Sequence, residues 1–488
     1  MLGPRTPILV GVGTSYDDAE AVELMVRATE AAARDAGNTD ILRAVQRVAV
    51  PRGTWSYTDP GRIVAERIGA DAHTHLVDLG IPQQTLINQA LAAIIDGELD
   101  VALVVGAEAK ARAARAAQRS HAANAEGIRT VFRRESEAEE IDQQGAQPDM
   151  HQTPQGEFLA MPEIEAGLYA PVEQYALMES ALRASDGITI EEHRREIAEL
   201  CARFNAVAHM NPDAAFPMKI EPAALAELGP GNRPLAFPYG KWHASQWTVD
   251  QAAALLLCSV EAAERVGIDR ERWLFPLIGI ESSASVSLSK RRDLHRWPAM
   301  RVLADAASEH LGHALAECDH QEVYSCFPLA VRVQQRELGL PVDGTPTITG
   351  GMTFAGGPFN SFVLQATAAM AQRLREHRGE GLITTVSGML TKPGLAVWAN
   401  EPGDQPPLVR DFAEEALAAT ATVDVVSCYE GPATIAAYTV TYDGQDAKEL
   451  VAIVDTTDGA RAIAKRNDPA LLARATTEEL IGTTLEPV

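Results

Sequence analysis

The chain has 488 residues, of which 46% are hydrophobic and 5% aromatic, and its 42 basic and 67 acidic residues give a net charge of −25. This length predicts two or three domains built from aliphatic layers, and the charge argues against nucleic acid or an anionic membrane as a partner. Five scattered cysteines without metal-ligand spacing, and the lack of an apolar run of about 18 residues, predict a cytoplasmic protein without a metal or a membrane span.

The first part of the chain alternates short apolar strands with helices. A turn after Leu79 leads into a helix that ends near Gly97 and then into an apolar strand at 101–105. Such alternation is typical of parallel strands joined by helices. The earlier strand and helix pairs are expected at 8–12 with 19–37 and at 48–51 with 59–69.

Residues 109–237 differ in composition from the segments before them, because a polar stretch (RRESEAEEIDQQ) is followed by amphipathic helices. We interpret them as an inserted lid. Their clearest helix begins at Thr189, where Thr189 and Glu192 form a capping box. Cys201 lies on the apolar face of that helix, so we expect it in the core.

A second loop, helix and strand follow at 350–358, 359–378 and 382–386, which suggests an internal duplication. After Asn400 the run EPGDQPP is typical of a linker. The alternating stretches beyond it predict a small β domain, such as a partly open barrel of the OB kind.

Several segments carry a family resemblance. PQQTLINQALAAIIDGELDVALVVGAEA resembles the nucleophile loop, helix and strand of thiolases, and GGMTFAGGP resembles their GGxxxxGHP loop. WSYTDPGRIVAERIGA, GLYAPVEQYALMESALR and GMLTKPGLAV resemble the thiolase-like protein type 1 group. The resemblance covers nearly the whole chain.

The resemblance implies an α/β protein with the duplicated thiolase fold, layered α-β-α-β-α, with an inserted loop domain and a small C-terminal all-β OB-like domain. The implied domains are 1–265 for the N-terminal half with the insertion at about 109–237, 266–402 for the C-terminal half, and 403–488 for the additional domain.

The groups that perform thiolase chemistry are missing. Carried over from the family motifs, the nucleophilic cysteine falls on Gly80, the histidine on Gly357 and the acid/base cysteine of CxGGG on Ser387. Glycine has no group to acylate, and an unassisted hydroxyl is a poor proton carrier. The resemblance therefore implies binding and oxyanion stabilisation by the turns Gly350-Gly351 and Ser387-Gly388, without classical thiolase activity.

Tyr324 is the leading catalytic candidate, because Tyr324-Ser325-Cys326-Phe327 aligns with the NEAF or HDCF motif of the family. Related retro-aldolases that act on steroid acyl-CoA esters use tyrosines as acid/base groups, a role that needs a lowered pKa here. The alternative is that Tyr324 only fills the pocket. Cys326 and Ser387 complete the catalytic candidates, although the core is the favoured place for Cys326.

Six residues are expected to bind substrate or coenzyme A. Ser245 falls where thiolases contact pantetheine, and Lys392 lies in LTKP, where the group has LTKH. His243 has two interpretations, a pocket role or a position in a surface turn. The full set is Ser245, His243, Gly351, Gly357, Gly388 and Lys392.

The expected ligand is coenzyme A or an acyl-CoA, with no metal or nucleotide cofactor, and residues 135–169 are expected to shape the acyl pocket. The leading hypothesis is an acyltransferase-superfamily enzyme that makes or breaks a carbon–carbon bond next to a thioester or ester carbonyl. The alternatives are a tyrosine-dependent acyl-CoA retro-aldolase, a catalytically silent CoA carrier and a scaffold protein. The chain is expected to be a monomer or a homodimer.

Overall fold

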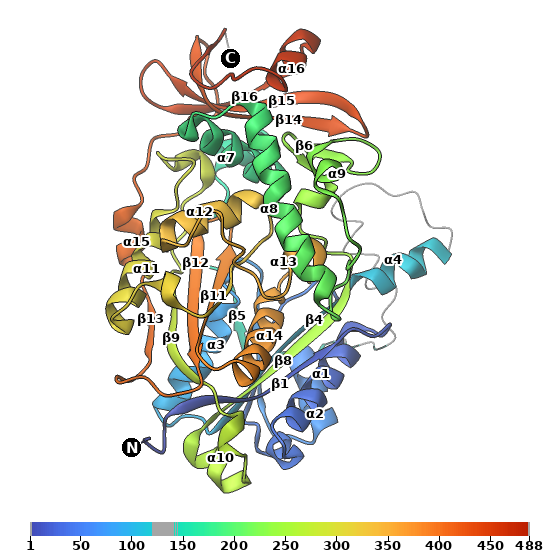
Figure 1. The fold of residues 1–488 in the computed structure, drawn as a ribbon, viewed down its shortest axis with the longest axis vertical. Helices are drawn as coiled ribbons and strands as arrows, with labels where there is room; N and C mark the ends of the chain where they lie inside the picture. Colours follow the sequence, from blue (N-terminus) through green and yellow to red (C-terminus); the bar gives the residue numbers. More distant parts are fainter. Residues whose placement is uncertain (1, 120–140, 142, 144, 487–488) are drawn as a thin grey trace.

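Two mixed β-sheets stack with a layer of helices between them, and a third sheet forms a separate C-terminal body at one end of the molecule (Figure 1). The computed structural model describes residues 2–119, 141, 143 and 145–486. Within these residues, no helix combines the length and the apolar character needed to cross a membrane.

The N-terminal sheet has the order β1-β8-β4-β2-β3-β5. The strands β2 to β5 run parallel where they pair, as the alternation of strands and helices predicts, whereas β8 is antiparallel to both β1 and β4. Its strands are β1 (Pro7–Ser15), β2 (Arg47–Pro51), β3 (His73–Val77), β4 (Val101–Ala109), β5 (Met150–Gln152) and β8 (Asp250–Ser259).

The second core sheet repeats this pattern with the order β10-β11-β12-β9-β13. Here β12 is antiparallel to both β9 and β11, as β8 is to β1 and β4, and β10 and β11 are parallel, as β2 and β4 are. This match supports the predicted duplication. The strands are β9 (Phe275–Glu281), β10 (His320–Glu322), β11 (Glu380–Ser387), β12 (Lys392–Ala399) and β13 (Leu408–Asp411).

The middle layer consists of α3 (Gln84–Ile95) and α14 (Phe362–Glu376), which both contact strands of the two core sheets. Buried residues cover most of each helix because each packs on both sides. The outer layers contain α1 (Ala21–Asp35) and α2 (Pro60–Ile68) on one side, and α11 (Pro298–Leu311) and α12 (Pro328–Leu338) on the other. The five-layer thiolase fold is thereby confirmed.

Part of the insertion, the helices α7 (Pro171–Asp186) and α8 (Ile190–Met210), lies between the core and the C-terminal body (Figure 1). The capping box at Thr189 and Glu192 is confirmed, and Cys201 is buried, as expected. The part of the expected lid at 120–140, 142 and 144 lies outside the described residues. The described insertion helices are α4 (Lys110–Arg119), α6 (Met161–Glu165), α7 (Pro171–Asp186), α8 (Ile190–Met210) and α9 (Pro222–Ala226).

The C-terminal body is an antiparallel sheet joined by two short strands of the insertion. It docks on α7, where the buried guanidinium of Arg183 bonds both Glu479 and the Tyr438 hydroxyl. Its elements are β14 (Ala433–Asp443), β15 (Asp446–Thr456), β16 (Arg461–Arg466), β17 (Thr484–Leu485) and α16 (Pro469–Ala475), with β6 (Pro234–Ala236) and β7 (Tyr239–Gly240) from the insertion.

The predicted domain limits stay predictions, as does the OB topology. One strand beyond the expected limit at 402, β13, pairs with β9 in the second core sheet. The next helix, α15 (Ala413–Ala419), packs against α11 of the outer layer. The chain thus returns to the core before it enters the C-terminal sheet.

Candidate active site between the two halves

Gly80, which the family motif aligns with the thiolase nucleophile, precedes α3 in a left-handed conformation with φ 93°. A Cβ at this position would lie 3.2 Å from Pro154 Cβ and 3.4 Å from Phe158 Cε1. The segment with Pro154 and Phe158 therefore covers the place where thiolases hold the thiol.

Gly357, which the family motif aligns with the thiolase histidine, has Ser245 packed against it. A Cβ there would lie 1.9 Å from Ser245 Oγ, and the Gly357 amide donates to the carbonyl of Gln246. Ser245 in turn donates its amide to the Cys326 carbonyl. Ser245 thus packs where a larger residue at 357 would begin, so the histidine's space is closed.

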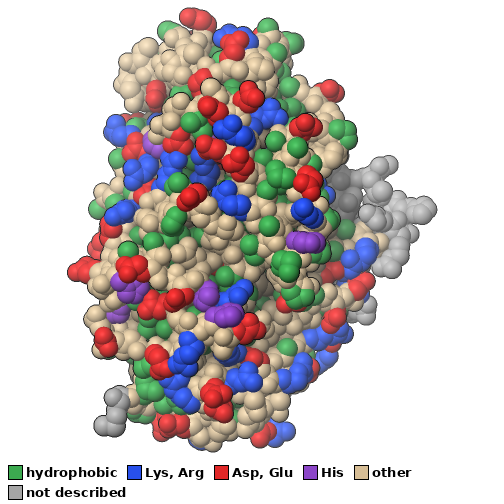
Figure 2. Space-filling view, viewed as in Figure 1, with side chains coloured by type: hydrophobic (Ala, Val, Ile, Leu, Met, Phe, Trp, Pro, Cys, Tyr) green, Lys and Arg blue, Asp and Glu red, His purple; other side chains and the backbone are tan. Residues whose placement is uncertain are grey.

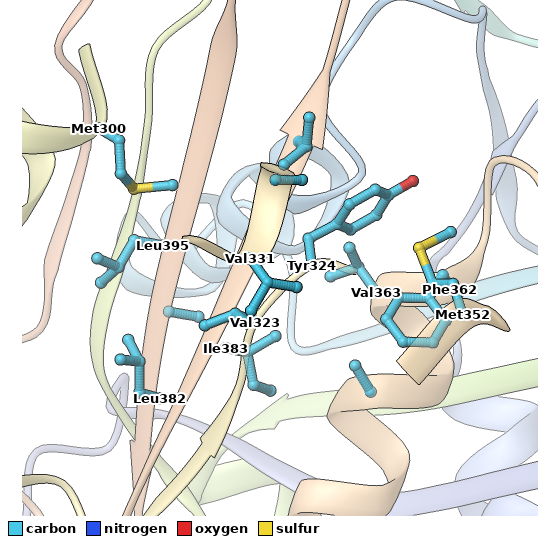
Figure 3. Close-up of a cluster of buried hydrophobic side chains, with 14 of the residues drawn as sticks. Met300, Val323, Tyr324, Val331, Met352, Phe362, Val363, Leu382, Ile383 and Leu395 are labelled. Carbon is cyan, nitrogen blue, oxygen red and sulfur yellow. The ribbon is translucent and has the colours of Figure 1, made fainter. Parts of the chain in front are cut away.

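Tyr324 is buried and stands edge-on to Phe362, with ring centroids 5.7 Å apart. Figure 3 shows its hydroxyl pointing away from the aliphatic side chains of Leu382 and Leu395. Burial raises the pKa of this hydroxyl, although a hydrogen bond with Gln83 opposes the rise. The lowered pKa that a tyrosine base needs is therefore absent, and Tyr324 remains a neutral hydrogen-bond donor at physiological pH.

Gln83, which sequence reasoning missed, links the two middle helices at this point. Its side-chain oxygen accepts from the Val363 amide at the start of α14 at 2.8 Å, while Gln83 itself caps α3. Its amide nitrogen approaches Asn360 at 3.4 Å. A buried glutamine at a helix start is the signal that would have revealed it, since buried amides need partners.

Cys326 is half-buried, and its thiol hydrogen-bonds with the hydroxyl of Tyr175 from α7. Burial raises the pKa of the thiol to about 12, so it is protonated at neutral pH and is a poor nucleophile. Tyr175 stacks on Phe327 with centroids 4.4 Å apart. The insertion therefore contributes a tyrosine to the site, which the sequence motifs did not indicate.

The glycine-rich loop at 350–358 contains a short helix, α13 (Gly351–Phe354), and is held by the buried carboxylate of Glu322. Glu322 accepts from the amides of Ile348 and Thr349 at 2.7 and 2.9 Å and from the hydroxyls of Thr347 and Thr349 at 3.0 Å. The same hydroxyls accept from the amides of Gly350 and Gly351. These two amides are engaged, which removes them as the expected oxyanion donors.

The turn between β11 and β12 keeps an unusual backbone. Gly388, Met389 and Leu390 have φ values of 62°, 54° and 56°, three left-handed residues in succession. Two of them carry a Cβ, which disfavours this conformation by about 1–2 kcal/mol each. Ser387, half-buried, ends the strand before the turn. Sites that retain such strain are frequently functional.

The strained turn is tied to the C-terminal body through arginines. The Arg291 guanidinium donates to the Met389 carbonyl at 2.8 Å, and burial lowers its pKa to about 10. Arg461 of β16 donates to the carbonyls of Arg291 and Arg292.

Comparisons with known proteins show what the chain is similar to. The chain matches the family model "Thiolase-like protein type 1 additional C-terminal domain" over residues 413–486. A crystal structure of a monomeric SCP2-thiolase-like protein type 1 from Mycobacterium smegmatis is 28% identical with a TM-score of 0.82, covering 100% of this chain and 98% of that one. The chain therefore carries the additional C-terminal domain of the type 1 thiolase-like proteins, and over its whole length it is similar to a solved structure of that group.

More distant structures share the fold alone. The acetyl-CoA acetyltransferase of Syntrophomonas wolfei is 16% identical with a TM-score of 0.54, covering 81% of this chain and 99% of that one. The Ltp2-ChsH2(DUF35) aldolase is 16% identical with a TM-score of 0.55, covering 82% and 99%. No curated protein matches the sequence significantly.

His243 does not reach the site of this thiolase-like protein. Its Nδ1 accepts from the Gly240 amide at 3.1 Å and its Nε2 lies 2.7 Å from the Leu225 carbonyl, while burial lowers its pKa to about 4. Both ring nitrogens serve the backbone of the insertion. The surface-turn interpretation is wrong because the residue is buried, and the geometry gives it a structural role.

Lys392 does reach the site. It begins β12, is only 2% exposed, and its Nζ donates to the carbonyls of Gly80 and Gln155 at 2.9 and 3.2 Å. An amine thus lies against the backbone of the missing nucleophile. The sequence resemblance named Lys392 but did not indicate this contact.

Proposed function

We propose that this thiolase-like protein binds an acyl-CoA and makes or breaks a carbon–carbon bond beside the thioester carbonyl without a covalent acyl-cysteine. The observation that carries the proposal is the buried Tyr324 hydroxyl, which is bonded to Gln83 at the start of α3. Its raised pKa keeps it protonated. A neutral, buried donor stabilises negative charge that develops on a carbonyl oxygen more strongly than an exposed one.

The retained strain at Gly388, Met389 and Leu390 supports a function at the same place. A chain that had lost all function there would lose nothing by relaxing this turn. Coenzyme A also needs positive charge or helix termini against the global charge of −25. On the face shown in Figure 2, basic side chains are interspersed with acidic ones, so local contacts would have to hold the phosphates.

The test compares Tyr324→Phe with Tyr429→Phe, which alters a half-buried tyrosine of the C-terminal domain. We expect Tyr324→Phe to abolish turnover of β-keto and β-hydroxyacyl-CoA esters while CoA binding, measured by calorimetry, survives. The Tyr429 variant should behave as the wild type. Wild-type rates in Tyr324→Phe would refute the mechanism.

One observation favours a second candidate, a catalytically silent acyl-CoA carrier. Pro154 and Phe158 close over Gly80, and Ser245 closes over Gly357. Incubation with a panel of acyl-CoA esters, followed by mass detection of products, separates the two candidates. Binding without any product supports the carrier, and a cleaved or condensed product supports the enzyme.

We further propose that the chain is a cytoplasmic monomer. The Mycobacterium smegmatis relative is described as monomeric, and all five cysteines are free thiols, as is usual in a reducing compartment. Light scattering on the full chain should give the mass of one copy. Removal of the residues beyond Thr420, which keeps β13 and α15 on the core, should leave one copy as well if the C-terminal sheet plays no part in assembly.

A further inference from the structure

Lys392 is a buried amine without a charged partner. Among the ion pairs of the described residues, none includes Lys392, and both acceptors of its Nζ are uncharged backbone carbonyls. A neutral amine has two N–H donors and one lone pair, so two carbonyls satisfy its donors and leave the lone pair unused. An ammonium would have a third donor to satisfy.

Burial lowers the pKa of Lys392, and the carboxylate of Asp411 on β13 opposes that effect. Asp411 is itself bonded by the amide and hydroxyl of Ser283. Glu281, which pairs with the exposed Asp411 across β9 and β13, is buried; burial raises its pKa to about 7, and it accepts from the Thr85 hydroxyl. Buried lysines with lowered pKa values are the ones that act as nucleophiles.

The position of Lys392 points the amine at the reaction centre. Its side chain lies on the same face of β12 as that of residue 394, because side chains two apart on a strand share a face. That residue is Gly394, where a Cβ would lie 2.9 Å from Gln84 Cβ, so this face is turned toward α3. The strained turn at 388–390 directly precedes Lys392 and fixes where the strand begins.

The cover over Lys392 is slight. Gln155 and Gly156 are exposed, and the segment is held by the Lys392 bond to the Gln155 carbonyl and by the Ser285 hydroxyl, which donates to the Glu157 carbonyl at 3.0 Å. A substrate carbonyl that reaches Nζ replaces the Gln155 carbonyl and displaces this segment.

We propose that Lys392 is a nucleophile that forms an imine with the ketone of a β-ketoacyl substrate, in the place of the missing thiolase cysteine. This inference rests on the proposed acyl-CoA function and adds the covalent step to it. A ketone carbonyl two carbons from a thioester is the chemical class that fits, because an amine condenses reversibly with a ketone but would be trapped as an amide by the thioester itself.

The step balances with water and one carbonyl compound as co-reactant. The Nζ lone pair adds to the ketone carbon, both amine hydrogens leave with the ketone oxygen as water, and a C=N bond remains. One proton from solvent gives the iminium, and loss of a proton to solvent from the carbon between the iminium and the thioester moves that C–H electron pair into an enamine. The enamine carbon adds to the carbonyl carbon of an aldehyde or ketone, whose oxygen takes up a proton as the new carbon–carbon bond forms, and the reverse of this addition breaks the bond. Water then hydrolyses the restored iminium and returns the amine and the ketone.

Reductive trapping tests the proposal on the full chain. Acetoacetyl-CoA is incubated with the protein and cyanoborohydride, and the adduct is mapped by peptide mass spectrometry. The chain has only seven lysines, so background labelling is easily resolved. We expect an adduct on the peptide with Lys392, with the mass of acetoacetyl-CoA less one oxygen atom. Labelling spread evenly over the lysines, or absent from Lys392, would overturn the proposal.

Two variants sharpen the result. Lys392→Arg can still donate to the Gly80 and Gln155 carbonyls but cannot form an imine, so its labelling should fall to background. Lys290→Arg changes an exposed lysine and should leave labelling at Lys392 unchanged. If Lys392→Arg does not fold, the wild-type map alone decides. Turnover without an adduct would refute the imine and leave the proposed function standing. An adduct without turnover would support the imine and refute the proposed carbon–carbon bond chemistry.

Discussion

Replacement of Glu322 by glutamine tests the electrostatics of the glycine-rich loop. Burial raises the pKa of Glu322 from its ordinary 4.5 to about 7 in the folded protein. Because the folded state then binds a proton more readily than the unfolded state, this carboxyl costs stability as pH rises from about 4.5 through 7. Glu322→Gln removes that slope, since an amide does not titrate. It keeps an acceptor for the amides of Ile348 and Thr349.

The magnitude follows from the shift. A rise from 4.5 to about 7, at about 1.4 kcal/mol for each pH unit, gives an upper limit of about 3.5 kcal/mol. Between pH 5 and pH 8 the variant should therefore gain about 2 to 3 kcal/mol of unfolding free energy relative to the wild type. Glu281, whose pKa burial also raises to about 7, is present in both proteins and cancels in the difference.

Urea unfolding of both proteins at pH 5 and pH 8 measures this difference. A gap between the two proteins that stays constant would mean that Glu322 is ionised throughout. In that case the hydrogen bonds from the 347–349 segment outweigh burial. If the wild type gains unfolding free energy relative to the variant between pH 5 and pH 8, the raised pKa of Glu322 is refuted.

Three further outcomes are expected. Gly350→Ala should lower the free energy of unfolding, measured with urea, by about 2–5 kcal/mol, because its Cβ would lie 2.4 Å from that of Ala208 at φ 99°. The control Gly267→Ala has φ 79° and open space around its Cβ, so only the unfavourable backbone conformation should lower its stability. Arg183→Met should weaken docking of the C-terminal domain by about 2–3 kcal/mol and release it to limited proteolysis, since Glu479 and Tyr438 lose their buried partner. Gly80→Cys should not restore thiolysis of acetoacetyl-CoA by coenzyme A, because Gly357 supplies no imidazole to activate the thiol; restored thiolysis would contradict the assignment of that position.

The architecture was predictable where local pattern and fold agree. The helices α3 and α14 and the strands after them follow from apolar periodicity and glycine turns, and their limits differ from expectation by only a few residues. The antiparallel strand β8 was not foreseen, because a buried strand reads as a continuous apolar run in either direction. The pairing of β6 with β14 was equally hidden, since contacts over such separations leave no local signal.

For the site, the family motifs located the missing groups but not their replacements. The sequence shows glycine at 80 and 357, where the family motifs have a cysteine and a histidine. It does not show that Phe158 and Ser245, from distant segments, pack against these positions. The pKa direction of Tyr324 also depends on burial, which a motif does not contain. A sequence motif gives the position of a residue in the fold. The chemistry of that residue depends on the neighbours that the tertiary structure places around it.

The additional C-terminal domain is therefore best understood through its contacts with the core rather than as an appendage. Arg461 donates to the carbonyls of Arg291 and Arg292, and the Arg291 side chain holds the Met389 carbonyl in the strained turn. A left-handed turn with two non-glycine residues persists only when its surroundings determine it. Since one of those restraints begins in the C-terminal sheet, the domain contributes to the geometry of the turn from which Lys392 and Ser387 extend.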